Sequence, residues 1–448
     1  MPKEIRLNAF EMNCVAHQSP GLWRHPRDRS RDYKRLGYWI ELAQILERGL
    51  FDGLFIADVL GVYDVFGGDA RAALAHAAQV PVNDPLLLVP AMAAATRHLG
   101  FGVTANLSFE PPYNFARRMS TLDHLTDGRI GWNIVTGYLD SAARGAGRNK
   151  QTAHDDRYDI ADEYMEVVYK LWEGSWADDA VKADAERGVF TDPERVRKVK
   201  HAGEHFRLDA LHLSEPSPQR TPVLYQAGTS PAGRGFAARH AECVFMSGPS
   251  KVVIAPRVAA IRGNAVKLGR QPEDILIFTL ATAILGATDA EAQAKLADYR
   301  RYADPEGALT LLSGWTGRFL KARPRPSGAA RRERGRPDRA RKHHAGRPEP
   351  KLDRAAGRRA CMHRRDRAGF RRLAVRRGRP DGRLDRGDRH RRLQSRLRRK
   401  AGDLRRRRRS LGPGASAAGS LQDPISRRNP AGEAVSRVAT VAASACWR

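Results

Sequence analysis

The segment AGTSPAGRG, which begins at Ala227, combines small residues with a hydroxyl just before a helical pattern. Gly228 lets the backbone approach a ligand closely, and Ser230 adds a hydroxyl donor ahead of the helix expected from Gly233. The first turn of a helix exposes free N–H groups at the positive end of its dipole, an arrangement that binds phosphate. The segment predicts an anion site, although a segment rich in Gly and Ser is usually only a turn.

Two further polar side chains, His154 and Tyr158, stand four residues apart in HDDRYDIADEYM, where a helix is expected to begin. Residues at this spacing lie on one face of a helix. The pair either presents two hydrogen-bonding rings to a binding site or only caps and staples the helix.

Asp58 and Thr104 lie at or near the ends of two apolar segments that read as buried strands. An Asp after a strand is about as often a helix cap as a functional group. His201 and His205 in HAGEH have metal-like spacing, but no third ligand is evident, so we predict no metal site. P-loop, nucleophile-elbow and dinucleotide-binding glycine motifs do not occur in the sequence.

The elements that must position these residues alternate between short apolar strands and segments with helical periodicity. The expected strands span residues 4–12, 51–59, 99–108, 129–137, 221–228, 243–248 and 275–285. The expected helices are Tyr33–Arg48, Pro85–Arg97 (with Asp84 as its N-cap), Asn114–Leu125, Asp155–Glu173, Gly233–Ala241, Val252–Leu268 and Asp289–Tyr302.

Strand–helix units repeated in this way imply parallel strands joined by right-handed crossovers. Seven such units favour an α/β fold of the (β/α)8 TIM-barrel type, in which ligands bind at the carboxyl ends of the strands. Asp58, Thr104 and Ser230 then fall on one rim. No eighth strand is recognisable, and residues 174–220 form a polar insertion.

Charge divides the chain into two parts. The formal net charge is +29, and residues 321–448 contain 41 Lys and Arg against 11 Asp and Glu. The four cysteines are widely spaced, which argues against a disulfide framework. The N-terminus lacks a signal-like apolar segment and no segment is long enough to span a membrane, so we expect a cytoplasmic protein.

Several long motifs resemble flavin-dependent monooxygenases of the nitrilotriacetate and dibenzothiophene-sulfone type, a branch of the bacterial luciferase-like superfamily. The resemblance runs from about Lys3 to Gly317 and is carried by NCVAHQSPGLWRHP, FIADVLGVYD, ANLSFEPPYNFARRMSTLDHLTDGRIGWNIVTG, HDDRYDIADEYMEVVYKLWEGSW and YQAGTSPAGRGFAARHAE.

The resemblance implies a two-component enzyme that uses reduced FMN (FMNH2) from a separate NAD(P)H-dependent flavin reductase, with O2 as co-substrate. A C4a-hydroperoxyflavin would oxygenate a small heteroatom compound such as an amino-polycarboxylate or a sulfone. Carried over by motif, the FMN-binding residues are Asp58, Thr104, His154, Tyr158 and Ser230. No catalytic acid or base is identified, while His17 and Trp132 are expected to line the substrate pocket. The family also implies a homo-oligomer.

Three interpretations compete for the basic part of the chain. A nucleic-acid-binding arm lacks the aromatic side chains that stack on bases, and a solvated linker would not be so rich in Arg. A shifted reading frame is the third: codons for LQSRLR, GDLRRRRRS and LQDPISRRNPAGEA, displaced by one base, can encode FNLAYA, ATFADVVDL and YKTPYREGTLREKL, which resemble the family's C-terminal sequence.

We therefore predict an incomplete luciferase-like barrel over residues 1–317 and a disordered, frame-shifted tail over residues 318–448. The tail should provide no eighth strand, which leaves two open sheet edges and makes activity of this chain doubtful. The alternatives are a deazaflavin-dependent oxidoreductase of the same barrel fold, or an inactive product whose basic tail binds nucleic acid.

Overall fold

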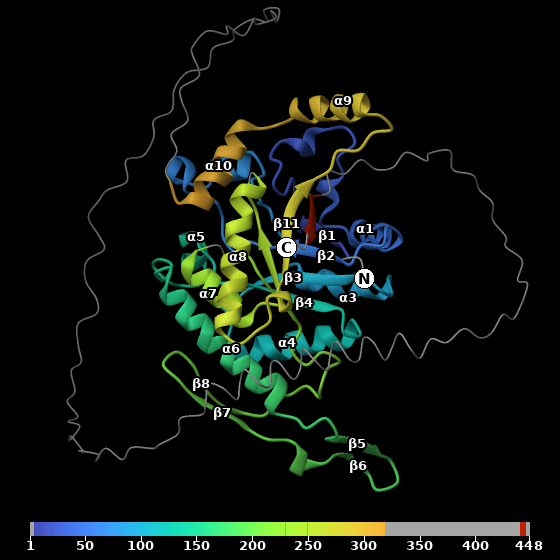
Figure 1. Cartoon of the computed structure of the whole chain (residues 1–448), viewed down its shortest axis with the longest axis vertical. Coiled ribbons are helices and arrows are strands. Elements are labelled where there is room, and N and C mark those ends of the chain that lie inside the picture. Colours follow the sequence, from blue (N-terminus) through green and yellow to red (C-terminus); the bar gives the residue numbers. More distant parts are fainter. Residues whose placement is uncertain (1–3, 229, 249, 319–439, 445–448) are drawn as a thin grey trace, which may run out of the picture. The chain divides into compact units, whose positions relative to one another are not determined.

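The computed structural model describes residues 4–228, 230–248, 250–318 and 440–444. The chain divides into two units, one formed by residues 1–322 with 390–448 and the other by residues 323–389. All described residues belong to the first unit, whose elements are labelled in Figure 1.

Eight strands close into a barrel in the order β1-β12-β11-β10-β9-β4-β3-β2. Seven of them run parallel to one another, and they correspond to the seven strands expected from the sequence. Their bounds are β1 Arg6–Met12, β2 Gly53–Ala57, β3 Gly100–Asn106, β4 Ile130–Val135, β9 Val223–Gln226, β10 Cys243–Met246 and β11 Leu276–Thr282. The α/β barrel of the predicted type is confirmed.

Helices connect these strands and cover the outside of the barrel (Figure 1). They are α1 Leu36–Arg48, α2 Arg71–Ala75, α3 Val89–Ala94, α4 Pro112–Leu125, α5 Asp140–Gly145, α6 Asp156–Gly174, α7 Pro231–His240, α8 Lys251–Lys267, α9 Asp289–Arg300 and α10 Pro305–Thr316. The helix expected from Pro85 instead begins as a 3-10 turn, Leu86–Leu88, where Asp84 accepts a hydrogen bond from the Leu86 amide at 2.9 Å. Five further 3-10 turns are Leu22–Arg24, Ser30–Asp32, Phe66–Gly68, Pro193–Arg195 and Pro272–Asp274.

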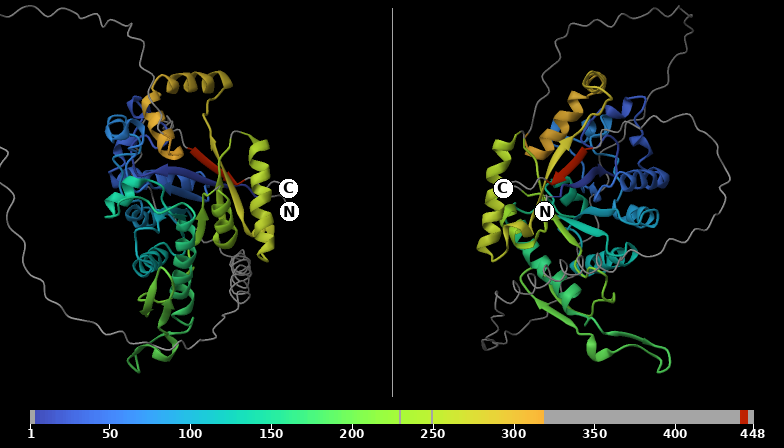
Figure 2. Two further views of the ribbon diagram at one scale, coloured as in Figure 1. Left: turned by 90° about the vertical axis from the view of Figure 1, so that its left-hand side faces the viewer. Right: turned by 45° about the vertical axis from the view of Figure 1, so that its right-hand side comes forward.

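The expectation that residues after 320 provide no eighth strand is wrong. Strand β12, Thr440–Ser444, fills the gap between β11 and β1 and runs antiparallel to both (Figure 2). The sequence TVAAS is an uncharged segment within the basic part of the chain. Unpaired N–H and C=O groups on β1 and β11 will accept any extended uncharged segment, whichever direction it runs. The strand closes the barrel, but not in the parallel manner of a (β/α)8 fold.

Aromatic rings fill the barrel interior. Phe55 and Phe245 have ring centroids 4.2 Å apart, and Tyr225 stacks on Phe245 at 5.5 Å. Glycine on β3 and β4 makes room for Tyr225, because a Cβ at Gly102 would lie 3.3 Å, and one at Gly131 2.6 Å, from its ring. These rings form an apolar floor beneath the carboxyl ends of the strands.

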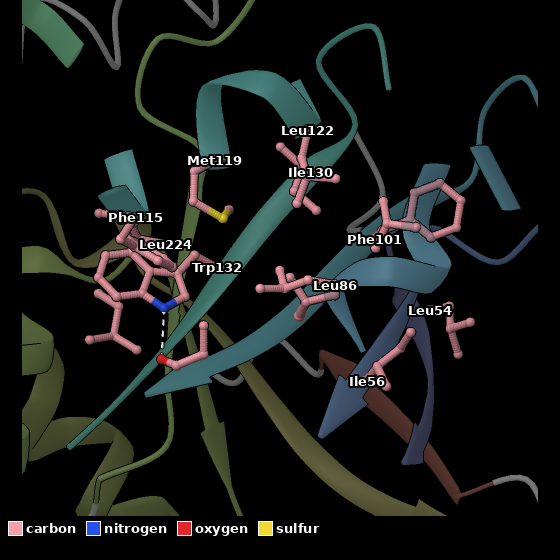
Figure 3. Close-up of a cluster of buried hydrophobic side chains, with 14 of the residues drawn as sticks. Leu54, Ile56, Leu86, Phe101, Phe115, Met119, Leu122, Ile130, Trp132 and Leu224 are labelled. Carbon is pink, nitrogen blue, oxygen red and sulfur yellow. Dashed lines mark hydrogen bonds between the residues drawn. The ribbon is translucent and has the colours of Figure 1, made fainter. Parts of the chain in front are cut away.

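The main hydrophobic core lies outside the strands, under α1, α3, α4 and α6, and Figure 3 shows part of it. Trp132 is fully buried against Phe115, with centroids 4.4 Å apart, and its indole N–H donates to the Ala105 carbonyl at 3.0 Å. The expectation that Trp132 lines a substrate pocket is wrong, because alternate residues of a strand face opposite sides and Gly131 takes the inward position.

The side of the barrel next to β12 is packed less densely. The last three residues of β11 are exposed, and α9 has no buried residue. Helix α10 is held more firmly, since Trp315 donates to the Tyr63 hydroxyl at 3.1 Å and a Cβ at Gly314 would meet the Tyr63 ring at 2.0 Å.

The polar insertion between α6 and β9 forms two antiparallel hairpins that project from the barrel (Figure 1). Their strands are β5 Val181–Asp184, β6 Val189–Thr191, β7 Val199–Ala202 and β8 Arg207–Ala210. In the described part of the chain no helix is long and apolar enough to cross a membrane.

Candidate functional site

Ser230 is the N-cap of α7. Its hydroxyl accepts a hydrogen bond from the Gly233 amide at 3.0 Å, as the sequence pattern predicts for a helix start. The positive end of the α7 dipole therefore lies at the carboxyl end of β9, where parallel barrels bind ligands.

Tyr158 of α6 reaches this helix start. Its hydroxyl interacts with the side chains of Ser230 and Gln226, and burial raises the pKa of the phenol, which keeps it protonated. A Cβ at Gly228 would lie 2.7 Å from that hydroxyl, and one at Gly233 would lie 2.8 Å away. The two glycines are thus required for Tyr158 to approach the α7 backbone.

The ring of His154 contacts the ring of Tyr158 edge to face, with the centroids 5.4 Å apart. Its side chain is 50% exposed, and Nδ1 lies 2.7 Å from the Asp155 carboxylate. The pair is on one face as predicted, but only Tyr158 is substantially buried. His154 occupies the outer edge of the site.

Thr104 of β3 points into the barrel next to Asn133 of β4, and the two residues are paired in register. The Asn133 amide donates to the Thr104 hydroxyl at 2.9 Å. Among the described residues Asn133 Oδ1 has no hydrogen-bond partner, although the residue is only 4% exposed. A buried acceptor without a donor costs about 1–3 kcal/mol, so this oxygen is available to a ligand N–H or O–H.

Asp58 follows β2 at the same end of the barrel. Burial, reinforced by the nearby charge of Asp84, raises the pKa of its carboxyl from 3.8 to about 6. Asp58 therefore changes charge close to neutral pH.

The structure joins the five predicted residues in two groups. Tyr158 contacts both His154 and Ser230. Thr104 connects to them through β4 and β9, since Asn133 pairs with Tyr225 and the next residue, Gln226, contacts Tyr158. Asp58 follows the neighbouring strand β2. That all five line one flavin-sized space remains a prediction.

A separate cavity of about 60 Å³ lies beyond the end of β1 and contains none of the five residues. Phe10, Glu11 and His17 line it, together with Tyr299 of α9. Burial lowers the pKa of His17 to about 3, so the imidazole is neutral, and Nδ1 lies 3.7 Å from Glu11. This cavity is too small for a flavin ring, and that His17 lines the substrate pocket stays a prediction.

Asn133 and Gln226 were not identified from the sequence. Gln226 is 3% exposed, and its Oε1 has no partner among the described residues. For Asn133 the signal was present, because strict alternation along GWNIV places it on the same inward face as Gly131. For Gln226 no such signal exists, since its role depends on the approach of Tyr158 from another element.

The sequence profile described as luciferase-like monooxygenase matches residues 12–386. Dimethyl-sulfide monooxygenase of Hyphomicrobium sulfonivorans is 55% identical over 317 residues, which are 71% of this chain and 66% of that protein. Long-chain alkane monooxygenase of Geobacillus thermodenitrificans is 53% identical over 317 residues, 71% of this chain and 72% of that protein. Nitrilotriacetate monooxygenase component A of Aminobacter aminovorans is 33% identical over 301 residues, 66% of each chain.

Solved structures agree in fold. The crystal structure of a riboflavin lyase with modified FMN and riboflavin superposes with a TM-score of 0.68 at 39% identity, covering 70% of each chain. The pairwise matches leave about a third of the relatives' length without a counterpart in this chain.

Proposed function

The chain belongs to the luciferase-like monooxygenase family, and on that premise we propose that it is a two-component monooxygenase that binds reduced FMN and oxygenates a small organic substrate. The observation that carries the proposal is the cradle formed by Tyr158, Gly228, Ser230 and Gly233 at the start of α7.

The residues of the site fit FMN in chemistry. The positive dipole end of α7 attracts a phosphate, and the Ser230 hydroxyl and the protonated Tyr158 phenol are donors suited to it. Further along the rim, the unpartnered oxygens of Asn133 and Gln226 are acceptors suited to ring N–H or ribityl O–H groups. The phosphate of FMN would suit the donors at the α7 start, and the N–H groups of its ring would suit the acceptor oxygens.

When bound, the reduced flavin supplies the electrons that activate O2 for transfer of one oxygen atom to the substrate. The protein's own residues hold and enclose it. Tyr158 and Ser230 would hold the phosphate. Thr104 fixes the Asn133 amide by accepting its N–H, which would leave the Asn133 oxygen for a donor of the flavin. The rings of Phe55, Tyr225 and Phe245 would exclude water from the part of the site that they line.

Asp58 is a carboxyl at this rim whose pKa burial raises from 3.8 to about 6. Its Oδ atoms hold a proton below about pH 6 and release it above. We propose that Asp58 exchanges a proton with the bound flavin or substrate.

A separate NAD(P)H-dependent flavin reductase is the proposed partner. Support comes from the relative named component A, a name that implies at least one further component. The substrate class remains open among the compounds in the relatives' names, which range from dimethyl sulfide to long-chain alkanes and nitrilotriacetate. The cytoplasm is the proposed location.

The test is an anaerobic titration of the full chain with FMNH2, followed by addition of 18O2 and each of these substrate types in turn. Incorporation of a single 18O atom into a product supports the proposal. Tight binding of FMNH2 with release of H2O2 alone under every substrate would contradict monooxygenation of these classes. Preference for a reduced deazaflavin without O2 consumption would favour the oxidoreductase alternative.

We also propose that the sequence after about residue 318 results from a shifted reading frame. The pairwise matches cover 317 residues while the relatives continue for a further quarter to a third of their length. Charge supports the same view, because 41 of the 79 Lys and Arg residues lie in residues 321–448. Resequencing the gene tests this directly, and an unchanged frame would refute it.

A further inference from the structure

The far end of α7, opposite the phosphate cradle, is tied to α6 by a compact polar cluster. Both oxygens of Asp162 are engaged: Arg239 Nε donates to Oδ1 at 3.1 Å, and a guanidinium NH2 contacts Oδ2. His240 Nε2 lies 2.9 Å from Oδ1. Asp162 thus holds the last two residues of α7 with a single carboxylate.

His240 is the buried member of this cluster, with a side chain 14% exposed. Burial lowers the pKa of its imidazole, while the Asp162 hydrogen bond opposes the shift, so the ring is neutral. Nε2 then carries the proton and donates it to Asp162, while Nδ1 accepts from the Tyr169 hydroxyl at 3.2 Å. Both ring nitrogens are satisfied by residues of α6.

The cluster shares a helix face with the cradle. Tyr158, Asp162 and Tyr169 are spaced four and seven residues apart, so all three lie on the side of α6 that faces α7. Rings connect them along the interface: Tyr158 packs on Phe236 at 5.6 Å, and Phe236 packs on His240 at 4.6 Å. Any rotation or slide of α7 on α6 would change both ends together.

We propose that Asp162 is a positioning residue for phosphate binding: by fixing Arg239 and His240, it sets the register in which Tyr158 meets the start of α7. This inference rests on the proposed flavin function. The Asp162 carboxylate lies one helical turn from Tyr158, and its hydrogen-bond partners are Arg239 and His240 at the opposite end of α7 from the cradle. The inferred route from Asp162 to the ligand is the position of α7, which these contacts fix.

The test compares dissociation constants for FMN and riboflavin, which differ only by the phosphate, in the full chain and in Asp162→Asn. Flavin fluorescence quenching reports both. The wild type should prefer FMN. Asp162→Asn should weaken FMN binding by on the order of tenfold while leaving riboflavin affinity unchanged. Arg239→Gln, which keeps the bond between His240 and Asp162, should produce a smaller change in the same direction.

Asp159→Asn is the matched control, because Asp159 is an exposed carboxylate on the same helix. It should leave both dissociation constants unchanged. An equal loss for FMN and riboflavin in Asp162→Asn would assign Asp162 a general structural role and overturn the inference, as would an unchanged preference. Failure of the wild type to bind either flavin would instead refute the proposed function, and the inference with it.

Discussion

Two sides of the same barrel differ sharply in how they are packed. On β4, every residue from Ile130 to Ile134 is buried, and the strand lies beneath the helices of the main core. On β11, the residues from Leu280 to Thr282 are exposed, and the helix that follows buries no residue at all. Both strands are hydrogen-bonded on both edges.

The difference shows that backbone pairing and side-chain packing contribute separately to a barrel. Strand β12 supplies hydrogen-bond partners to β11 and β1, but no residue of α9 is buried on this side. Net hydrogen bonds contribute about 1 kcal/mol each, whereas burial of a large apolar side chain contributes about 1.5–3 kcal/mol. We therefore expect stability to come mainly from the side containing β2, β3 and β4.

The largest predicted effect tests this expectation. Trp132→Ala should lower the free energy of unfolding by about 3–5 kcal/mol, because it leaves a cavity among fully buried rings. Leu280→Ala on β11, where the side chain is 37% exposed, should cost about 0.5 kcal/mol or less. Urea denaturation measures both, and similar losses at the two positions would contradict the comparison.

Asp58 follows β2, on the densely packed side of the barrel. The pH dependence of stability measures the free-energy cost of burying its charge. Its folded pKa of about 6 exceeds the unfolded value of 3.8. The stability it contributes is therefore fully present below pH 4 and is lost as the pH rises to about 6. Asp58→Asn does not titrate, so its advantage over the wild type should grow over this interval by on the order of 2 kcal/mol.

Unfolding curves collected between pH 4 and pH 7.5 give this difference directly. Parallel stability profiles for the wild type and Asp58→Asn would show that the carboxyl is not desolvated.

On the β12 side, the contact between α10 and Tyr63 is the firmest attachment. Gly314→Ala would place a Cβ 2.0 Å from the Tyr63 ring and should destabilise the protein by about 1–3 kcal/mol through overpacking. Gly263→Ala in α8 is the control, since a Cβ there has no neighbour within 4 Å and should stabilise the helix by about 0.5–1 kcal/mol. Thermal unfolding distinguishes the two signs.

The smallest predicted stability effect comes from removing an N-cap hydroxyl. Comparing two such helix caps tests whether one of them also binds FMN. Ser230→Ala and Thr288→Ala each remove an N-cap hydroxyl, from α7 and α9 respectively, at about 1 kcal/mol each. Only Ser230→Ala should weaken FMN binding, by about tenfold, because it also removes a phosphate donor. Equal FMN affinity in the two variants would remove Ser230 from the proposed site.

The seven parallel strands were predictable because each short apolar segment is followed by a longer segment with helical periodicity. This alternation distinguishes the strands from the helices. The helix from Pro85 was expected to reach Arg97, but α3 ends at Ala94. Strand β12 was missed because TVAAS is too short to be distinguished by periodicity. Its pairing depends on two edges whose availability no local pattern reveals.

The predictable residues of the candidate site are those that lie at the start of a helix, where the sequence pattern is recognisable. Ser230 caps a helix and Tyr158 sits one turn into another, so both leave a sequence signal. Asp162 leaves none, since its partners Arg239 and His240 are recognisable only once α6 and α7 are placed side by side. The prediction for Trp132 was wrong because a Trp on a strand can face either side of the sheet. Gly131 faces the barrel interior, so the neighbouring Trp132 faces outward.

The antiparallel strand β12 is joined to the rest of the barrel only through residues 319–439. The strand is held in place by backbone pairing with β1 on one edge and β11 on the other. Backbone pairing does not depend on which chain supplies the strand. A second copy of the chain that offers Thr440–Ser444 would therefore compete for the position between β1 and β11, and exchange of β12 between molecules would depend on protein concentration.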